Sequence, residues 1–565
     1  MPLDSVTLAI RAPSLADLYP DAPAAETGPL GPAAYLDADQ RAGLGDNGKT
    51  SYTIDQAANQ IIRGAPGWSG VLGEPSTVTY AYRADAPPTM PDDTAGFQPF
   101  NAAQIDQAET AIKAWEDVAN IRLVRVGAGD SGPAAYSDNA TILLGDYTTG
   151  QAGASAFTFF PGSSRASSSS GDVWVNVSLG YNFAPSPGTY GALTLVHELG
   201  HSIGLDHPSD YDASANSTLS YATDASYYED DRQYSVMSYF GESNTGANFG
   251  GVYPAAPMLD DIAAAQLEYG ANMSTRTGDT VYGFHATADE PWFAASGPTS
   301  KLVFAVWDAG GNDTFDFSGY GQNQLIDLRA GDFSNVGGLV GNVAIAQGVA
   351  IENAIGGGGA DRIFGNDAGN QIFGHGGADT IVGGAGSNYL RGDDGNDSIQ
   401  GGTGFNDING NLGDDVIDGH SQVGDWLVGG QGNDLITSHT SGNILYGNIG
   451  NDTLVGGGGG EIIRGGQGDD SIAAGAGGAW LSGDRGNDTL QGGAGADTFH
   501  GFTGAGLDRV LGFEVGKDHV QLDPGTVYAV SQVGADTVIS MGPGDNMVLV
   551  GVQATTLPPG WIFGA

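Results

Sequence analysis

The spacing of apolar residues changes near the middle of this 565-residue chain. Up to about residue 272, apolar residues recur either at three- and four-residue steps or at every second position, as is typical of helices and strands respectively. From Gly356 to His500 they follow a nine-residue period instead. The two patterns predict an α+β domain followed by a repeat domain with a different kind of core.

Two helices and several strands are predicted in the first domain. Asn101 is of the residue type that caps a helix N-terminus. The apolar residues after it recur at helical spacing: Ile105, Ala108, Ile112, Trp115 and Ala119. A second helix is expected from about Thr189 to Gly204. Segments of alternating apolar residues predict strands at 121–126, 141–144, 156–160 and 173–177.

The second domain is a series of nonapeptides with the pattern Gly-Gly-x-Gly-x-Asp-x-apolar-x. We count sixteen units from Gly356, with one extra residue in the unit that begins at Gly419. The eighth position is apolar in every unit, from Ile363 to Phe499. Six residues of turn and three of strand make half a coil, so the repeat predicts a right-handed parallel β-roll with two units in each coil. The eighth-position side chains then fill its thin core.

The sixth position of the repeat alternates along the chain. Every other unit carries aspartate there, a set that we call the Asp edge: Asp361, Asp379, Asp397, Asp415, Asp434, Asp452, Asp470 and Asp488. The units between them, the amide edge, carry Asn370, Asn388, Asn406, Asn443, Glu461 and Ala479, and regain aspartate at Asp497. Because alternate units lie on opposite sides of a roll, the two sets should form two separate ladders.

Stacked coils lie about 4.8 Å apart, which brings each loop over the next. Carboxylates and turn carbonyls then surround a shared gap that suits Ca²⁺. The predicted calcium ligands are all the sixth-position aspartates named above, Asp497 included, together with Gly357, Gly359, Gly374 and Gly377. We expect tighter calcium binding along the Asp edge than along the amide edge.

The composition agrees with a cation-binding role and excludes several function classes. The formal charge is −47, which argues against a nucleic-acid partner and makes divalent cations the natural counterions. The chain has no cysteine, so disulfides, thiolate zinc sites and cysteine nucleophiles are excluded. Its first residues lack a Sec-type signal peptide, and no apolar run is long enough to span a membrane. Export, if it occurs, must use another route.

The segment HELGHSIGLDH, residues 197–207, holds three of the nine histidines. His197 and His201 are four residues apart, so one helical face can present both to a metal ion. Gly204 ends the helix and allows a turn that brings His207 back as a third ligand. Three imidazoles and a water make an open zinc site. We therefore predict one catalytic Zn²⁺, with Glu198 placed to take a proton from its water.

A further segment, YSVMSYF at 234–240, contains Met237 and Tyr239. By itself, an apolar segment with a methionine is more often part of a core. After the zinc motif, it resembles the Met-turn of metzincin peptidases. That resemblance implies that Met237 forms the floor of the metal site. In the serralysin branch it also implies that Tyr239 is a further zinc ligand, which swings to stabilise the oxyanion.

Residues 45–500 as a whole resemble the serralysin-type RTX metallopeptidases, which are secreted by bacteria. Besides the two motifs, the resemblance rests on SYTIDQAANQIIRG, DDRQYSVMSYF, RTGDTVYGF, VWDAGGNDTFDFSGY and IENAIGGGGADRI. It implies a zinc peptidase domain joined to a calcium-loaded roll. It also implies calcium ligands before the regular repeats: Arg276, Gly278 and Thr280 through backbone carbonyls, then Asp308, Gly310, Gly311, Asp313 and Glu352.

The resemblance further implies an N-terminal propeptide and export to the extracellular medium by a type I transporter that reads the uncleaved C-terminus. The expected segments are a leader at 1–45, the metzincin-type α+β domain at 46–272, and connecting strands with the first calcium sites at 273–355. The β-roll at 356–500 and a cap with the secretion region at 501–565 follow. We expect a monomer, with polypeptides as substrates and a small protein inhibitor as a candidate partner.

The predicted function is a calcium-stabilised zinc endopeptidase of broad specificity that acts on extracellular proteins. Substrate would lie extended along an edge strand, with 156–160 as the candidate. The alternative is a calcium-binding surface, adhesion or scaffold protein with an inactive peptidase domain, which should have lost a ligand or Glu198. An RTX lipase would need a Gly-x-Ser-x-Gly motif, and the sequence contains none.

Overall fold

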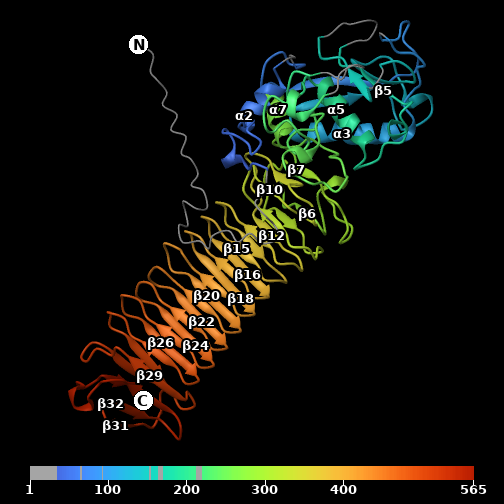
Figure 1. The fold of residues 1–565 in the computed structure, drawn as a ribbon. Coiled ribbons are helices and arrows are strands. Elements are labelled where there is room, and N and C mark those ends of the chain that lie inside the picture. Colours follow the sequence, from blue (N-terminus) through green and yellow to red (C-terminus); the bar gives the residue numbers. More distant parts are fainter. Residues whose placement is uncertain are drawn as a thin grey trace, which may run out of the picture.

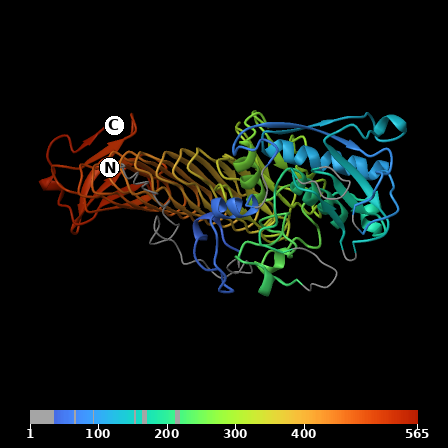
Figure 2. The ribbon, with the colours of Figure 1, turned by 90° about the horizontal axis from the view of Figure 1, so that it is seen from above.

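The computed structural model describes residues 35–564, except 64–66, 92, 152–153, 163–169 and 212–218. The molecule is elongated: an α/β unit stands at one end, a long stack of short strands forms the shaft, and antiparallel strands close the other end (Figure 1). The same order is visible from above (Figure 2). This architecture confirms the predicted α+β domain followed by a parallel β-roll. Residues 1–34 of the predicted leader lie outside the described residues.

A five-stranded sheet forms the frame of the first domain, in the order β2-β1-β3-β5-β4. Its strands are β1 Ser76–Tyr82, β2 Ile121–Arg125, β3 Ile142–Tyr147, β4 Ala156–Thr158 and β5 Val173–Asn176. The pairings are parallel except that of β4, which lies antiparallel to β5 at one edge of the sheet. The alternating sequence pattern correctly predicts β2 to β5 and misses β1.

The helices of the described chain are α2 Ile54–Ile61, α3 Ala102–Val118, α4 Gly180–Phe183, α5 Tyr190–Ser202, α6 Tyr221–Asp224 and α7 Leu259–Tyr269. Short 3-10 turns occur at η1 Ala38–Gln40, η2 Pro133–Ala135, η3 Glu242–Asn244, η4 Pro291–Phe293 and η5 Ala554–Thr556. Asn101 caps α3 as predicted, since its Oδ1 accepts from the backbone N–H of Ala103 at 3.0 Å. The indole N–H of Trp115 on α3 donates to the carbonyl of Val196 on α5 at 3.0 Å, which braces α5. None of the described helices is long and apolar enough to cross a membrane.

Two thirteen-stranded sheets form the roll, and from β12 to β31 successive strands alternate between them. One sheet contains β6 Val281–Gly283, β8 Thr314–Asp316, β12 Asn353–Ile355, β14 Gln371–Phe373, β16 Asn388–Asp394, β18 Asn406–Leu412, β20 Trp426–Gln431, β22 Ile444–Ile449, β24 Ile462–Gln467, β26 Trp480–Arg485, β28 Thr498–Gly501, β30 His519–Leu522 and β34 Ile562–Phe563. The other contains β9 Leu325–Asp327, β13 Arg362–Phe364, β15 Thr380–Val382, β17 Ser398–Gln400, β19 Val416–Asp418, β21 Leu435–Thr437, β23 Thr453–Val455, β25 Ser471–Ala473, β27 Thr489–Gln491, β29 Leu507–Leu511, β31 Ala529–Val533, β32 Asp536–Ser540 and β33 Asn546–Leu549. A small sheet of β7 Phe304–Val306, β10 Phe333–Ser334 and β11 Val343–Ile345 lies where the two domains join.

The pairing register confirms the predicted coil of two repeats. Neighbouring strands of one sheet pair residues 18 apart, such as Arg362 with Thr380. The separation becomes 19 where a pairing spans the extra residue, as between Val416 and Leu435. All sixteen eighth-position side chains are at most 1 % exposed, so they form the predicted core. The sheets also continue beyond the regular repeats, from β6 to the antiparallel cap of β31, β32 and β33.

The two domains share one continuous hydrophobic core. Residues 35–45, which the sequence pattern assigns to the leader, are packed across their junction. The Tyr35 hydroxyl donates to Oδ1 of Asn335 in the first part of the roll at 2.9 Å. The guanidinium of Arg41 donates twice to the buried carboxylate of Asp260 on α7, at 2.8 Å each. This segment therefore holds both domains together.

Candidate functional site

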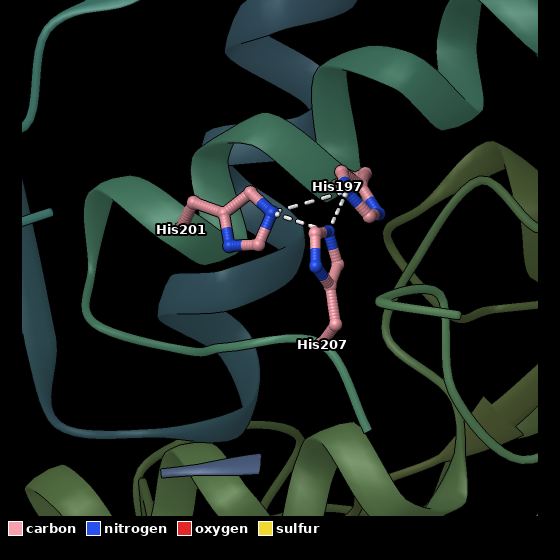
Figure 3. A group of neighbouring side chains, drawn as sticks. All are labelled: His197, His201 and His207. Atoms are coloured by element: carbon pink, nitrogen blue, oxygen red, sulfur yellow. Dashed lines mark hydrogen bonds between the residues drawn. The ribbon is translucent and has the colours of Figure 1, made fainter. Parts of the chain in front are cut away.

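Helix α5 presents two of the motif histidines from its last turns. His197 and His201 are one turn apart, and a φ of 106° at Gly204 turns the chain so that His207 faces them both. The Nε2 atom of His201 lies 3.1 Å from that of His197 and 3.1 Å from that of His207, and the third separation is 3.3 Å. Figure 3 shows the three rings converging on one point. The fold thus brings together the three residues that the sequence predicts as ligands.

Each of these imidazoles is oriented by a backbone carbonyl at its other nitrogen. The Nδ1 atoms lie 2.9 Å from the Val236 oxygen for His197, 2.7 Å from the Leu205 oxygen for His201 and 2.8 Å from the Tyr211 oxygen for His207. Because a carbonyl can only accept, each Nδ1 carries the ring proton and each Nε2 carries a lone pair. Three lone pairs this close repel one another unless a cation lies between them.

The donor set and its spacing fit Zn²⁺. A tetrahedral zinc ion with Zn–N bonds of about 2.0–2.1 Å separates its ligands by roughly 3.3 Å. The Nε2 separations of 3.1–3.3 Å are close to that value. Burial lowers the pKa of His197 to about 4 and the pKa of His201 to about 3. All three rings are therefore neutral near pH 7, which is the form that binds a metal.

Glu198 lines the same cavity of about 570 Å³ as the three imidazoles. One carboxylate oxygen, Oε2, accepts a hydrogen bond of 2.7 Å from the Thr158 hydroxyl on β4. Burial raises the pKa of Glu198 to about 7, and the bond from Thr158 opposes that rise. A buried carboxyl in this range can both accept and release a proton. No sequence pattern links Thr158 to Glu198, so only the fold reveals this contact.

Tyr239 lies against the histidine cluster. Its ring centroid is 4.4 Å from that of His207 and 5.6 Å from that of His197, and it lines the same cavity. This position agrees with a role near the metal, although the role itself stays a prediction.

Met237 lies beneath α5 and is fully buried. A side chain at Gly200 would overlap its sulfur, so a glycine in α5 leaves the space that the thioether fills. The turn around Met237 is held by Asp261 on α7, whose carboxylate accepts from the Ser235 hydroxyl at 2.6 Å and the Val236 N–H at 2.7 Å. Burial raises the pKa of Asp261 to about 7. Val236 in turn orients His197, so Asp261 is a supporting residue that the sequence analysis missed.

The Asp edge forms an unbroken ladder along the second sheet. Oδ1 of each aspartate from Asp379 to Asp488 accepts the backbone N–H of the aspartate one coil earlier, at 2.7–2.9 Å. Their other oxygen, Oδ2, is buried and has no hydrogen-bond partner in seven of them: Asp379, Asp397, Asp415, Asp434, Asp452, Asp470 and Asp488. Burial raises the pKa to about 8 at Asp379 and Asp470. A column of buried oxygens without donors fits Ca²⁺, which takes six to eight oxygen ligands.

The turn glycines surround these oxygens closely. The N–H of Gly357 donates to Oδ2 of Asp361 at 2.6 Å. Side chains at Gly374 and Gly377 would overlap Oδ2 of Asp379 and the carbonyl of Gly359 respectively. The predicted glycine ligands therefore lie beside the predicted carboxylates, and glycine is required there because the loops approach one another so closely.

The asparagines of the amide edge satisfy their own hydrogen bonds, whereas Oε2 of Glu461 on the same edge is buried without a partner. The side-chain amide of Asn406 donates to the carbonyls of Gly402, Gly404 and Gly419, each at 3.0 Å. The next member of this ladder is Asp425, which is buried and accepts from the Asn406 N–H at 2.9 Å. Asp425 was not predicted from the sequence because the extra residue moves it to the seventh position of its unit.

The predicted ligands before the repeats also form one cluster. Oδ1 of Asp313 accepts from the Thr280 N–H at 2.8 Å, and Oε2 of Glu352 accepts from the Asp313 N–H at 2.8 Å. Oδ2 of Asp313 is buried without a partner. The other members of the cluster are Asp308, Gly310, Gly311 and Gly278. Oδ1 of Asp308 accepts a hydrogen bond from the N–H of Gly310. A side chain at Gly311 would lie 2.6 Å from the carbonyl oxygen of Gly278. The guanidinium of Arg276 is paired with Asp117 at 3.0 Å, and the predicted role of its backbone carbonyl stays a prediction.

Both ladders continue past the regular repeats. On the Asp edge, Oδ1 of Asp508 accepts a hydrogen bond of 3.4 Å from the backbone N–H of Asp488. On the amide edge, Oδ1 of Asp518 accepts one of 3.0 Å from the N–H of Asp497. Neither residue was predicted from the sequence, because the nine-residue period ends before them. The Asp-x-apolar spacing of the repeat is preserved at Asp508 and Asp518, and that signal identifies them.

The fold and the site together are those of a metzincin-type metallopeptidase joined to a β-roll. Residues 271–527 match the family model described as Peptidase M10 serralysin C terminal. Serralysin C of Dickeya chrysanthemi is 48 % identical over 56 % of this chain and 65 % of its own length. Metalloprotease AprA of Pseudomonas entomophila (strain L48) is 44 % identical over 63 % of this chain and 72 % of its own length. The chain belongs to the serralysin family.

The alignments do not span the relatives completely, since this chain covers 65 % of that serralysin C. Among solved structures, the extracellular lipase LipA of Serratia marcescens matches at 18 % identity, over 38 % of this chain and 40 % of its own, with a TM-score of 0.17. That score is too low to compare the folds.

Proposed function

We propose that this chain is a secreted, calcium-stabilised zinc endopeptidase that cleaves unfolded polypeptides with broad specificity. The observation that carries the proposal is the convergence of three imidazole lone pairs in a cavity that also contains Glu198. His197, His201 and His207 would hold the zinc ion, which would supply Lewis-acid chemistry to a water molecule and to the scissile carbonyl.

The protein side chains then divide the proton and charge transfers between them. Glu198 takes the proton of the attacking water and later gives it to the leaving amine. The hydrogen bond from Thr158 fixes the orientation of that carboxylate. Tyr239, packed against His207, stabilises the negative charge that develops on the carbonyl oxygen.

The substrate is proposed to add a strand to the sheet at β4. This strand has a partner on one side only among the described strands, and its Thr158 contacts Glu198. Recognition through backbone hydrogen bonds reads no particular side chain, which favours broad specificity and extended substrates. The predicted strand at 156–160 is thus kept as the binding edge.

Calcium is proposed to occupy the Asp edge and the cluster around Asp313, where buried carboxylate oxygens lack donors. We further propose that the protein leaves the cell through a type I transporter that reads 501–565, and that a leader precedes the packed residues from Tyr35 onward. The alternative, a scaffold or adhesion protein with an inactive peptidase domain, is disfavoured because Glu198 and all three histidines are in place.

The test is hydrolysis of unfolded casein by the purified chain, with zinc content measured, in millimolar calcium. Glu198→Gln keeps the shape of the side chain and removes the base, so we expect kcat to fall by about 10²- to 10⁴-fold with zinc still bound. The matched control is Glu74→Gln, at an exposed glutamate, which should retain full activity. An active Glu198→Gln protein would refute the proposed role of Glu198. The scaffold alternative is supported if the unsubstituted chain, shortened to begin at Tyr35 and loaded with zinc, does not cleave casein either.

A further inference from the structure

Three side chains that neither proposed metal set uses meet on the surface of the roll: Asp418, His420 and His439. One ligand atom from each lies within 4.8 Å of the other two. Oδ1 of Asp418 is 2.7 Å from Nε2 of His439 and 4.0 Å from Nδ1 of His420. The two imidazole centroids are 5.2 Å apart. Two imidazoles and one carboxylate therefore converge from two consecutive coils.

The pairing of β19 with β21 explains why these residues meet. Asp418 pairs with Thr437, so the residues two positions further on, His420 and His439, also stack on one another. This pairing joins residues 19 apart, whereas those on either side of it join residues 18 apart. The group thus lies on the coil that contains the extra residue of the repeat. His420 follows β19 and His439 follows β21, so the group belongs to the roll and not to the domain that contains α5.

The neighbouring coils have no similar group at the corresponding positions. The column that contains His420 and His439 holds glycine in the flanking coils: Gly384, Gly402, Gly457, Gly475 and Gly493. The column that contains Asp418 holds Val382, Gln400, Thr437, Val455 and Ala473. The repeat therefore departs from its glycine pattern at His420 and His439, and both departures meet an aspartate at the variable ninth position, Asp418.

We propose that Asp418, His420 and His439 bind a second transition-metal ion of the Zn²⁺ class, separate from the peptidase site and from the calcium ladders. Imidazole nitrogens suit Zn²⁺, Ni²⁺ and Cu²⁺, whereas Ca²⁺ prefers oxygen ligands. The atom separations of 2.7 and 4.0 Å lie on either side of the roughly 3.3 Å expected between ligands of a tetrahedral zinc ion. The side chains are 35–48 % exposed, so they can adjust to that geometry while a water completes the fourth position.

The ion cross-links two consecutive coils where the repeat is longest. The extra residue lengthens the turn that follows His420. Bonds from the metal ion to His420 on one coil and to His439 on the next hold this turn to the neighbouring coil. A tie between coils at this point keeps the strand register from slipping where the nine-residue period fails.

The test is the number of zinc ions that the full chain binds at equilibrium in millimolar calcium, by calorimetric titration and by metal analysis. We expect two per chain, and one for the double variant His420→Gln, His439→Gln. The matched control is His375→Gln: His375 also occupies the second position of its repeat with a positive φ of 73°, is exposed, and belongs to no such three-ligand group among the described residues. The control should bind two zinc ions, and casein hydrolysis should be unchanged in all three proteins.

A stoichiometry of one in the unsubstituted chain overturns the proposal, and that measurement does not depend on a variant that folds. A stoichiometry of two in the double variant overturns it as well, provided that its far-UV circular dichroism matches the parent. Asp418→Asn, which keeps the shape of the side chain, should weaken the second equivalent by at least tenfold and leave the first unaffected.

Discussion

The two edges of the roll are built on the same repeat and differ at one position. On the Asp edge, Oδ2 of Asp415 is buried without a donor. On the amide edge, the side chain of Asn406 donates to the turn carbonyls of Gly402, Gly404 and Gly419. An amide carries both a donor and an acceptor, whereas a carboxylate only accepts. The asparagine side chains of the amide edge therefore complete their own turns, whereas the Oδ2 atoms of the Asp edge are left without donors, where calcium is proposed to bind.

With calcium at the proposed sites, this difference would make the folding of the roll depend on calcium. Each coil contributes one turn to each edge, so a coil cannot close on the amide edge alone. Buried carboxylates without partners cost free energy when they ionise, and the raised pKa of Asp379 and Asp470 expresses that cost. A cation bound at each of these carboxylates would remove the cost, and the stability of the roll would then depend on the calcium concentration.

Of the changes that test the difference between the two edges, calcium removal should have the largest effect on the structure of the roll. With a chelator at neutral pH, we expect the roll to lose its β-sheet signal in far-UV circular dichroism, because seven buried carboxylate oxygens lose their cations together. The peptidase domain should lose stability too, since both domains share one core. Mg²⁺ should not substitute, because it demands a tighter octahedral site. A roll that keeps its sheet signal without calcium contradicts the distinction between the edges.

Asp415→Asn converts one step of the Asp edge to the chemistry of the other edge. At saturating calcium we expect the free energy of unfolding of the roll to fall by about 1–3 kcal/mol, because a calcium ligand is lost. Without calcium we expect the same substitution to raise the free energy of unfolding, since the amide brings its own donor. Urea unfolding followed by circular dichroism measures the free energy of unfolding with and without calcium. The control is Asp367→Asn, at an exposed aspartate of the roll. The same loss at both calcium levels would show that the carboxylate serves packing alone.

Asn406→Asp is the reciprocal change and should have the smallest effect. The aspartate cannot donate to the three turn carbonyls, so at low calcium we expect a loss of about 1–2 kcal/mol. Added calcium should restore part of the lost stability if the new carboxylate binds calcium as those of the Asp edge are proposed to do. Asn451→Asp is the control, because that exposed side chain uses its Oδ1 as an acceptor, which aspartate retains. Destabilisation that calcium leaves unchanged would mean that the two edges differ in backbone shape as well.

Sequence reasoning recovered the parts of the site that depend on local spacing. His197 and His201 share a helical face at any position in a fold, and Gly204 permits the turn to His207. The repeat likewise predicts the coil, its core and both ladders, because each coil contacts mainly its neighbours. It failed at Asp425, where one extra residue shifts the count, and at Asp508 and Asp518, where the glycine pattern ends.

Contacts between distant segments could not be predicted in this way. Thr158 meets Glu198 from 40 residues away, and Asp261 supports the turn under His197 from another helix. Residues 35–45 fall within the predicted leader because the first 45 residues as a whole are rich in alanine, proline and aspartate and show no strong period. Their partners, Asn335 and Asp260, are remote in the sequence. No local period marks such residues.

The sequence by itself therefore determined the class of fold, the three histidines with Glu198, and the alternation of two ladders. Each of these follows from a spacing that local geometry converts directly into proximity. Only the tertiary structure decided which oxygens lack donors, what orients Glu198, and that Asp418, His420 and His439 meet on one surface. Those facts depend on which segments the long-range packing brings together, and burial and hydrogen bonding are defined only once that packing exists.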